Sequence, residues 1–284
     1  MALKLMYITN KPEIAKIAEQ SGVDYIFIDM EYIGKDIRQK GLNTVQNHHT
    51  IDDIRNMKRI VSKSSVLVRI NPIHGSSSNY KSSEDEINLA INAGADVLML
   101  PYFKTVEEVK YFISCVAGRV KTCLLLETPE AVVLIDSILN IKGIDMIHIG
   151  LNDLHLALKM KFMFQVLSDG IVEYLGNKIK AKGIPFGFGG IAKLNTGLLP
   201  GALVIKEHYR LGSSMAILSR SFCNTDVITD IDIVEREFHE GVKQIRELEA
   251  EAEFVRSYFS VSHDKVVECI NNIVSNIEKQ NEIR

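Results

Sequence analysis

Two acidic residues, Glu127 and Asp153, occupy matching positions in the chain. Each one closes an apolar run, residues 123–127 for the first and residues 146–153 for the second. The two acids are 26 residues apart, which is about the length of one strand, one helix and their turns. In a parallel sheet this spacing puts both carboxylates at the same edge, on adjacent strands. Paired carboxylate oxygens suit Mg²⁺ or Mn²⁺, so the spacing predicts a divalent metal site.

Eight short apolar segments alternate with helical patterns and must position these acids. They lie at residues 3–9, 25–30, 65–71, 97–102, 121–128, 146–151, 184–189 and 214–219. The segments are continuously apolar, as is typical of parallel strands that are covered on both faces. Helical patterns occupy residues 12–20, 83–92, 105–116, 130–139, 164–182 and 202–211, and another begins after Thr50. Asn10 and Thr50 are the predicted N-caps of the first two helices.

The number of repeating units favours one architecture. Eight β/α units in about 225 residues predict an α/β fold of the (β/α)₈ TIM barrel type. The structural alternative is a doubly wound open sheet, which would carry a glycine-rich phosphate turn after an early strand. The turn at residues 9–12 is Thr-Asn-Lys-Pro and does not match. We therefore divide the chain into a catalytic barrel, residues 1–225, and a C-terminal helical extension, residues 226–284.

The extension carries apolar residues at helical, nearly heptad spacing. One stripe is predicted to run through residues 233–259, and a second helix follows with Val266, Ile270, Ile273 and Ile277. The pattern is consistent with an eighth barrel helix and a packed tail. It is equally consistent with a subunit interface or an exchanged helix. We expect a homo-oligomer.

Bulk composition excludes some classes of partner. The 284-residue chain has a formal net charge of −3, which gives no bias toward nucleic acid or membrane surfaces. It lacks any apolar run near the ~20 residues that span a bilayer. The four cysteines are scattered without metal-ligand spacing, and the N-terminus shows no signal-peptide pattern. We therefore expect a cytoplasmic protein with no nucleic-acid or membrane partner.

Further polar residues end the predicted strands, where TIM-barrel enzymes carry their chemistry. Besides the two acids, these are Asp29, Glu31 and Tyr32 after the second strand, Arg69 in the third, Gly189 and Gly190 in the seventh, and Arg220 after the eighth. Each has a simpler explanation, such as a helix cap for Asp153 or a structural salt bridge for Arg69. Their joint occurrence favours a shared metal or substrate, because a charge at the end of an apolar strand is costly unless paired.

Five segments of the chain carry a family resemblance. They are Asp29-Met30-Glu31, Val68-Arg69-Ile70-Asn71-Pro72, residues 93–101, Glu127-Thr128-Pro129-Glu130-Ala131 and residues 149–154. In this order they resemble the signature segments of the HpcH/HpaI aldolase and citrate lyase β-subunit family, over roughly residues 3–222. The resemblance implies a phosphoenolpyruvate/pyruvate-type barrel in which Glu127 and Asp153 hold Mg²⁺ or Mn²⁺. It also implies a C-terminal helix that packs onto a neighbouring subunit.

The resemblance further implies how a substrate is bound. Arg69 would bind the carboxylate and keto oxygen of a 2-oxo acid and stabilise its enolate, and backbone N–H groups near Gly189 and Gly190 would hold a carboxylate. Asp29 is a further candidate for substrate binding. Arg220 is a candidate for binding a phosphate or a second carboxylate.

The general base is the main departure from the family pattern. Tyr32 stands where the family's aldolases carry a histidine, and a free tyrosine, with a pKa of ~10, is a poor base near neutrality. A polar insertion, residues 33–47, follows with Lys35, Arg38 and Lys40, and then come His48 and His49. We interpret this segment either as an exposed loop or as a lid that brings His49 or His48 over the metal. The candidate catalytic residues are therefore Arg69, His49, His48 and Tyr32.

These residues predict a divalent-metal-dependent carbon–carbon lyase of the class II aldolase type. It would act on a 2-oxo acid through a pyruvate-like enolate, with an aldehyde as the second partner, because a metal and a guanidinium offset charge on the enolate oxygen. The predicted strand ends hold no lysine, which disfavours a Schiff base. One alternative is an acyl-CoA ester lyase related to the citrate lyase β-subunit. Another is a degenerate barrel that binds a 2-oxo acid without turnover, which Tyr32 and an apolar Leu125 motivate.

Overall fold

Eight parallel strands close into a barrel in the computed structural model, which describes residues 2–35, 47–254 and 258–282. The strands are β1 (Lys4–Ile8), β2 (Tyr25–Asp29), β3 (Ser65–Arg69), β4 (Val97–Leu100), β5 (Lys121–Leu126), β6 (Met146–Ile149), β7 (Phe186–Ile191) and β8 (Met215–Leu218). Each pairs with the next, and β8 pairs with β1. The predicted (β/α)₈ TIM barrel is confirmed, and most strands end one or two residues before their predicted limits.

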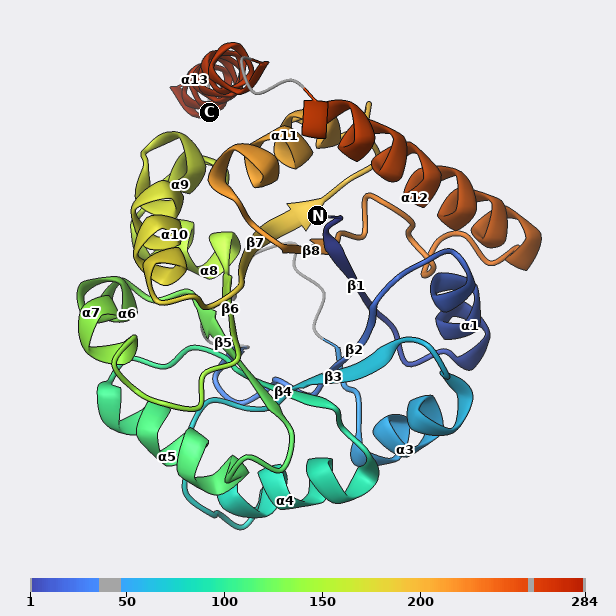
Figure 1. Cartoon of the computed structure of the whole chain (residues 1–284), viewed down its shortest axis with the longest axis vertical. Coiled ribbons are helices and arrows are strands. Elements are labelled where there is room, and N and C mark those ends of the chain that lie inside the picture. Colours follow the sequence, from blue (N-terminus) through green and yellow to red (C-terminus); the bar gives the residue numbers. More distant parts are fainter. Residues whose placement is uncertain (1, 36–46, 255–257, 283–284) are drawn as a thin grey trace.

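Helices surround the barrel (Figure 1). They are α1 (Pro12–Gln20), α3 (Ile51–Ile60), α4 (Ser83–Ala93), α5 (Val106–Val116), α6 (Pro129–Val133), α7 (Ile135–Ile138), α8 (Leu151–Ala157), α9 (Gln165–Ser168), α10 (Ile171–Ala181), α11 (Gly201–Leu211), α12 (Ile231–Phe254) and α13 (Tyr258–Glu282). None of the helices in the described ranges is long and apolar enough to cross a membrane.

The predicted helix caps are partly right. Thr50 caps α3 through a capping box with Asp53, as predicted. The prediction of Asn10 as the cap of α1 is wrong, because Lys11 occupies that position and provides no side-chain cap. The Asn10 amide instead donates to Asp53 Oδ1 at 3.4 Å. The predicted helix 164–182 is also interrupted: Gly170 adopts a φ of +82° between α9 and α10.

Side-chain alternation along the strands separates the barrel core from the rim. Inward-facing apolar residues such as Phe27, Leu67 and Leu125 form one buried cluster inside the barrel. Outward-facing residues of the same strands pack against the helices in a larger cluster. Because successive inward positions are two residues apart, Phe27 and Leu67 are followed by Asp29 and Arg69 at the carboxyl ends of their strands. The apolar core therefore leads directly into charged residues.

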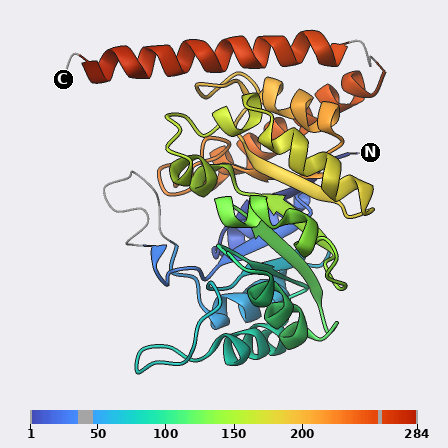
Figure 2. The same ribbon diagram turned by 90° about the vertical axis from the view of Figure 1, so that its left-hand side faces the viewer.

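The C-terminal helices have two different locations. Phe238, Val242 and Ile245 of α12 are buried, and α12 packs against α1 and α11, so it completes the ring of helices beyond residue 225 (Figure 1). The prediction of one stripe through residue 259 is wrong, because residue 259 belongs to α13, whereas α12 is described as far as Phe254. Helix α13 lies outside the ring, against α11 and α9, and crosses one side of the molecule (Figure 2). An oligomer built with α13 stays a prediction.

A buried histidine lies between α11 and the barrel. The ring of His208 stacks on Phe188 with centroids 3.9 Å apart and an interplanar angle of 8°, and its Nδ1 lies 2.8 Å from Ser213 Oγ. Burial, together with the nearby His148, lowers the pKa of His208 to about 3. The folded protein therefore keeps this imidazole neutral.

We expect His208 to make the protein less stable in acid. An unfolded histidine binds a proton near pH 6.5, whereas His208 in the folded protein does so only near pH 3. The unfolded state therefore holds more protons between these limits, so the free energy of unfolding falls as the pH drops from about 6.5 to about 3. Urea unfolding across this range should show a shallower pH dependence in His208→Gln than in the wild type. Equal slopes would contradict the assignment.

Candidate active site

A cavity of about 480 Å³ opens at the carboxyl ends of the strands. Many of the predicted site residues line it together: Asp29, His49, Arg69, Glu127, Asp153, Gly189, Gly190 and Arg220. Tyr32 and His48 are not among its described lining residues. The Tyr32 side chain is 44% exposed, and its backbone N–H donates to Asn71 Oδ1 at 2.9 Å. Most of the predicted site residues therefore line one cavity, whereas Tyr32 and His48 are not among its described lining residues.

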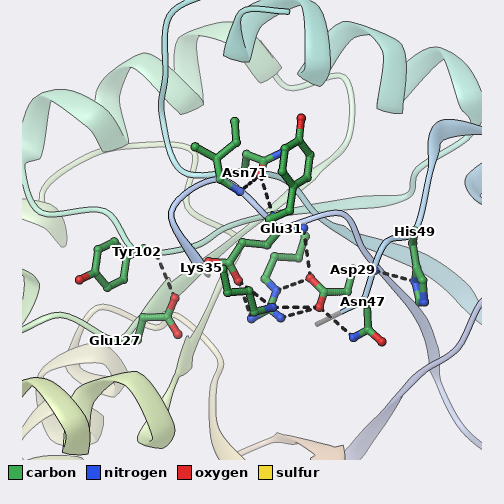
Figure 3. Close-up of polar contacts among 11 residues, drawn as sticks. Asp29, Glu31, Lys35, Asn47, His49, Asn71, Tyr102 and Glu127 are labelled. Atoms are coloured by element: carbon green, nitrogen blue, oxygen red, sulfur yellow. Dashed lines mark hydrogen bonds and ion pairs between the residues drawn. The ribbon is translucent and has the colours of Figure 1, made fainter. Parts of the chain in front are cut away.

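Glu127 directly follows β5, and its carboxylate is held in a fixed position. Glu127 is 3% exposed, and Oε1 accepts the backbone N–H of Tyr102 at 3.1 Å (Figure 3). Tyr102 adopts a left-handed φ of +50°, a conformation that non-glycine residues adopt at a cost. A Cβ at Gly150 would lie 2.7 Å from Glu127 Oε2, so a glycine at the end of β6 leaves space for the carboxylate.

Asp153 lies in the first turn of α8, which begins directly after β6 and Gly150. Gly150 is the N-cap of this helix, so Asp153 is not its capping residue. Asp153 is 9% exposed and lines the same cavity as Glu127. Two carboxylates that follow the neighbouring strands β5 and β6 therefore line one cavity.

The donor set fits a hard divalent cation. Mg²⁺ in proteins is often bound by one or two carboxylates and completes its coordination with water and substrate oxygens, which matches Glu127 and Asp153. In the described part of the chain, no group of three or more histidine, cysteine, aspartate or glutamate residues is arranged to hold a metal. Carboxylate oxygens are the donors that Mg²⁺ and Mn²⁺ prefer over soft ligands.

Arg69 ends β3 and is held from one side by Asp29. Its Nε and Nη2 atoms donate to the two Asp29 carboxylate oxygens, each at 2.8 Å, and Nη1 lies 3.3 Å from Glu31 Oε2. Burial opposes the charge of Arg69, but the two carboxylates raise its pKa still further above the usual range. A guanidinium has five N–H donors in a rigid fork, so this pairing fixes its orientation and leaves donors for a ligand.

Asp29 accepts several hydrogen bonds at the site. Besides its bonds with Arg69, Asp29 accepts a hydrogen bond from Asn47 Nδ2 at Oδ2, at 3.0 Å. The same oxygen lies 3.2 Å from Lys35 Nζ (Figure 3). Burial disfavours its charge, but the charge and hydrogen bonds of Arg69, with Lys35 and Asn47, hold the pKa of Asp29 well below its usual range. Asp29 therefore stays ionised and orients Arg69.

His49 reaches the cavity, but one of its nitrogens is already used. The backbone N–H of Asp29 donates to His49 Nδ1 at 3.0 Å, which assigns the ring proton of the neutral imidazole to Nε2. Burial lowers the pKa of His49. The predicted role of His49 as a base would require this tautomer to change, whereas donation from Nε2 would not. His48 is exposed.

Lys35 was predicted only as one of the basic residues of a polar insertion at the catalytic rim, either an exposed loop or a lid that attracts an anionic substrate. It is 4% exposed and lines the cavity, with Nζ between Asp29 Oδ2 at 3.2 Å and Glu31 Oε2 at 3.3 Å. The one available signal was its position four residues after Glu31. Arg38 and Lys40, the other basic residues of the predicted lid, lie outside the described residues.

Two further elements complete the rim. In β7 the pairing register with β8 shifts between Gly187 and Gly190, and Gly189 takes a φ of +55°. The Gly189 carbonyl accepts from His148 Nε2 at 3.2 Å. Arg220 is exposed at the cavity and makes no ion pair with another described residue. It is thus available to an anionic ligand.

Comparisons with known proteins agree with the barrel fold. The model of a family described as HpcH/HpaI aldolase/citrate lyase matches residues 4–164, more than half of the chain. An HpcH/HpaI aldolase from Desulfitobacterium hafniense DCB-2 is similar in structure, with a TM-score of 0.58 and 18% identity over 87% of this chain and 93% of that one. Citrate synthase SbnG is similar with a TM-score of 0.58 and 15% identity over 83% and 94%. Curated proteins gave no sequence match.

Proposed function

Because the chain belongs to the HpcH/HpaI aldolase/citrate lyase family, which supports a lyase activity, we propose that it is a divalent-metal-dependent carbon–carbon lyase acting on a 2-oxo acid. The observation that carries this proposal is the meeting of Glu127, Asp153 and Arg69 at one cavity. Two carboxylates for a cation and a guanidinium for an anion are the groups that enolate chemistry needs.

Each residue has a distinct part in the proposed reaction. Glu127 and Asp153 would hold Mg²⁺ or Mn²⁺, and the bound ion would supply positive charge near the keto oxygen of the substrate. Arg69 directs its remaining N–H donors at the same substrate. Because Asp29 fixes the guanidinium in advance, little reorganisation is needed when negative charge develops.

The rest of the cavity would select and orient the substrate. Backbone groups of Gly189 and Gly190 are proposed to hold the carboxylate of the 2-oxo acid. Arg220, at the mouth, is proposed to bind an anionic group on the second partner. An aldehyde is the proposed second partner, because cleavage beside a hydroxyl-bearing carbon releases one.

Proton exchange of pyruvate tests the proposal most directly. The protein is incubated with pyruvate in D₂O with and without Mg²⁺ or Mn²⁺, and loss of the methyl proton signal is followed by NMR. We expect exchange that requires the metal and falls at least about 100-fold in Asp153→Ala, because the cation site loses one of two charged ligands. Exchange without metal, or full exchange in Asp153→Ala, would contradict the proposal. Absent exchange, with cleavage of an acyl-CoA ester, would favour the alternative lyase.

A further inference from the structure

Lys35 is a buried cation that the proposed mechanism leaves without a role. Its side chain is 5% exposed and is drawn beside the Asp29 and Glu31 carboxylates in Figure 3. Taking an ammonium out of water is costly unless it is paired. The fold meets this cost with two carboxylates, at 3.2 and 3.3 Å, and still leaves Lys35 at the cavity surface.

The four charged groups form a closed ring. Asp29 Oδ2 contacts both Lys35 Nζ and Arg69 Nη2, and Glu31 Oε2 contacts both Lys35 Nζ and Arg69 Nη1. Two acids thus hold two cations side by side, and the ring carries no net charge. Lys35 is therefore fixed next to the guanidinium that is proposed to bind the substrate.

A count of donors shows what remains for a ligand. An ammonium has three N–H donors. Among the described residues, Lys35 donates one hydrogen bond, to Asp29 Oδ2 at 3.2 Å, and its 3.3 Å contact with Glu31 Oε2 is an ion pair. Because Lys35 also lines the cavity, its ammonium lies where a ligand in the cavity could accept a further hydrogen bond. A Schiff base does not follow from this geometry, because an amine attacks a carbonyl only without its proton, whereas both carboxylates bind the ammonium form.

We propose, resting on the proposed function, that Lys35 is a catalytic residue whose ammonium donates a hydrogen bond to the substrate oxygen that becomes negative in the enolate. Lys35 forms no covalent bond and keeps its proton. It acts beside Arg69 as a second fixed positive charge. The charge on that oxygen increases as the enolate forms, so the contact strengthens along the reaction. It therefore lowers the activation barrier of enolate formation more than it tightens substrate binding.

Two measurements on Lys35→Gln test the proposal. We expect the maximal rate of metal-dependent pyruvate exchange to fall about 10- to 100-fold, with KM changed less than about threefold, since a charge-assisted hydrogen bond made mainly in the transition state is lost. Oxalate, a planar dianion that resembles the enolate, should bind more weakly by a similar factor in calorimetry with Mg²⁺. Lys11→Gln is the matched control, because Lys11 lines the same cavity but contacts Thr225 O and Asp226. It should change either value less than about threefold.

Distinct outcomes separate this assignment from the proposed function. A folded Lys35→Gln with normal exchange and oxalate affinity, a rise in KM alone, or an equal loss in Lys11→Gln would overturn the role of Lys35. So would reductive trapping of pyruvate on Lys35 by borohydride. A wild type that neither exchanges pyruvate nor binds oxalate would overturn the proposed function itself.

A measurement on the wild type covers a variant that does not fold. Oxalate with Mg²⁺ should shift the ammonium signal of Lys35 in NMR spectra of the ¹⁵N-lysine-labelled protein. Lys178, which pairs with Asp136 and is not among the described lining residues of the cavity, is the reference and should not shift. A Lys35 signal that oxalate leaves unchanged would overturn the assignment.

Discussion

Glu127→Gln is expected to abolish metal-dependent pyruvate exchange, with a loss of at least about 1,000-fold. Glutamine keeps the shape of the side chain and an oxygen that can accept the Tyr102 N–H, now at 3.1 Å, so the local backbone should persist. The variant removes the negative charge that a divalent cation requires. Mn²⁺ binding measured by calorimetry should weaken together with the exchange rate measured by NMR.

Glu130→Gln is the matched control for that experiment. Glu130 lies three residues further along, pairs with Lys104 at 3.3 Å and has a side chain that is 48% exposed. We expect this variant to exchange pyruvate and bind Mn²⁺ like the wild type. Normal Mn²⁺ binding in Glu127→Gln, or an equal loss in Glu130→Gln, would argue against Glu127 as a metal ligand.

Arg69→Lys is expected to lower kcat/KM about 100- to 1,000-fold although the charge is conserved. The guanidinium binds both oxygens of Asp29 at 2.8 Å and reaches Glu31 with a third nitrogen. A lysine is a single point donor and cannot reproduce this fork. Removal of one preorganised donor to a developing oxyanion typically costs 10²- to 10³-fold in rate. Steady-state kinetics of exchange at saturating metal would measure the loss.

Arg210→Lys separates the catalytic effect from the structural one. Arg210 also grips a buried carboxylate with two nitrogens, Glu207, at 3.0 and 2.9 Å, but Arg210 is not among the cavity's described lining residues. Both variants should lower the melting temperature, because each leaves a buried acid imperfectly paired. Only Arg69→Lys should lose activity. Comparable losses of activity in the two variants would show that Arg69 acts through folding.

The barrel was predictable because its signals are local. Each strand appears as a short, continuously apolar run, and each of the two proposed metal ligands follows such a run. The inward direction of Asp29, Arg69 and Glu127 follows from alternation along strands whose earlier inward residues are apolar. The predicted strand ends and the residue types found there together placed both predicted metal ligands at one rim of the barrel.

The contacts of irregular segments were not predictable in the same way. Lys35 lies in a stretch without a periodic pattern of apolar residues. Its partners are Asp29, at the end of β2, and Glu31, just after β2, and both of these also pair with Arg69 of β3. No local pattern states that these segments converge on one ring. The tautomer of His49 likewise depends on a backbone N–H twenty residues earlier in the chain. Such features emerge only when the closed barrel fixes its loops against one another.

The charge balance of the cavity has a kinetic consequence. Among the described residues that line it, Asp29, Glu127, Asp153 and Asp226 are acidic, and Lys11, Lys35, Arg69 and Arg220 are basic. Equal numbers of opposite charges at short range produce a weak field outside the protein. Without the divalent cation, diffusing anions would thus gain little long-range attraction. The proposed cation adds two positive charges, so anions should associate faster with the metal-loaded protein, and more so at low ionic strength. Discrimination between ligands would arise after entry, where individual donors meet individual oxygens.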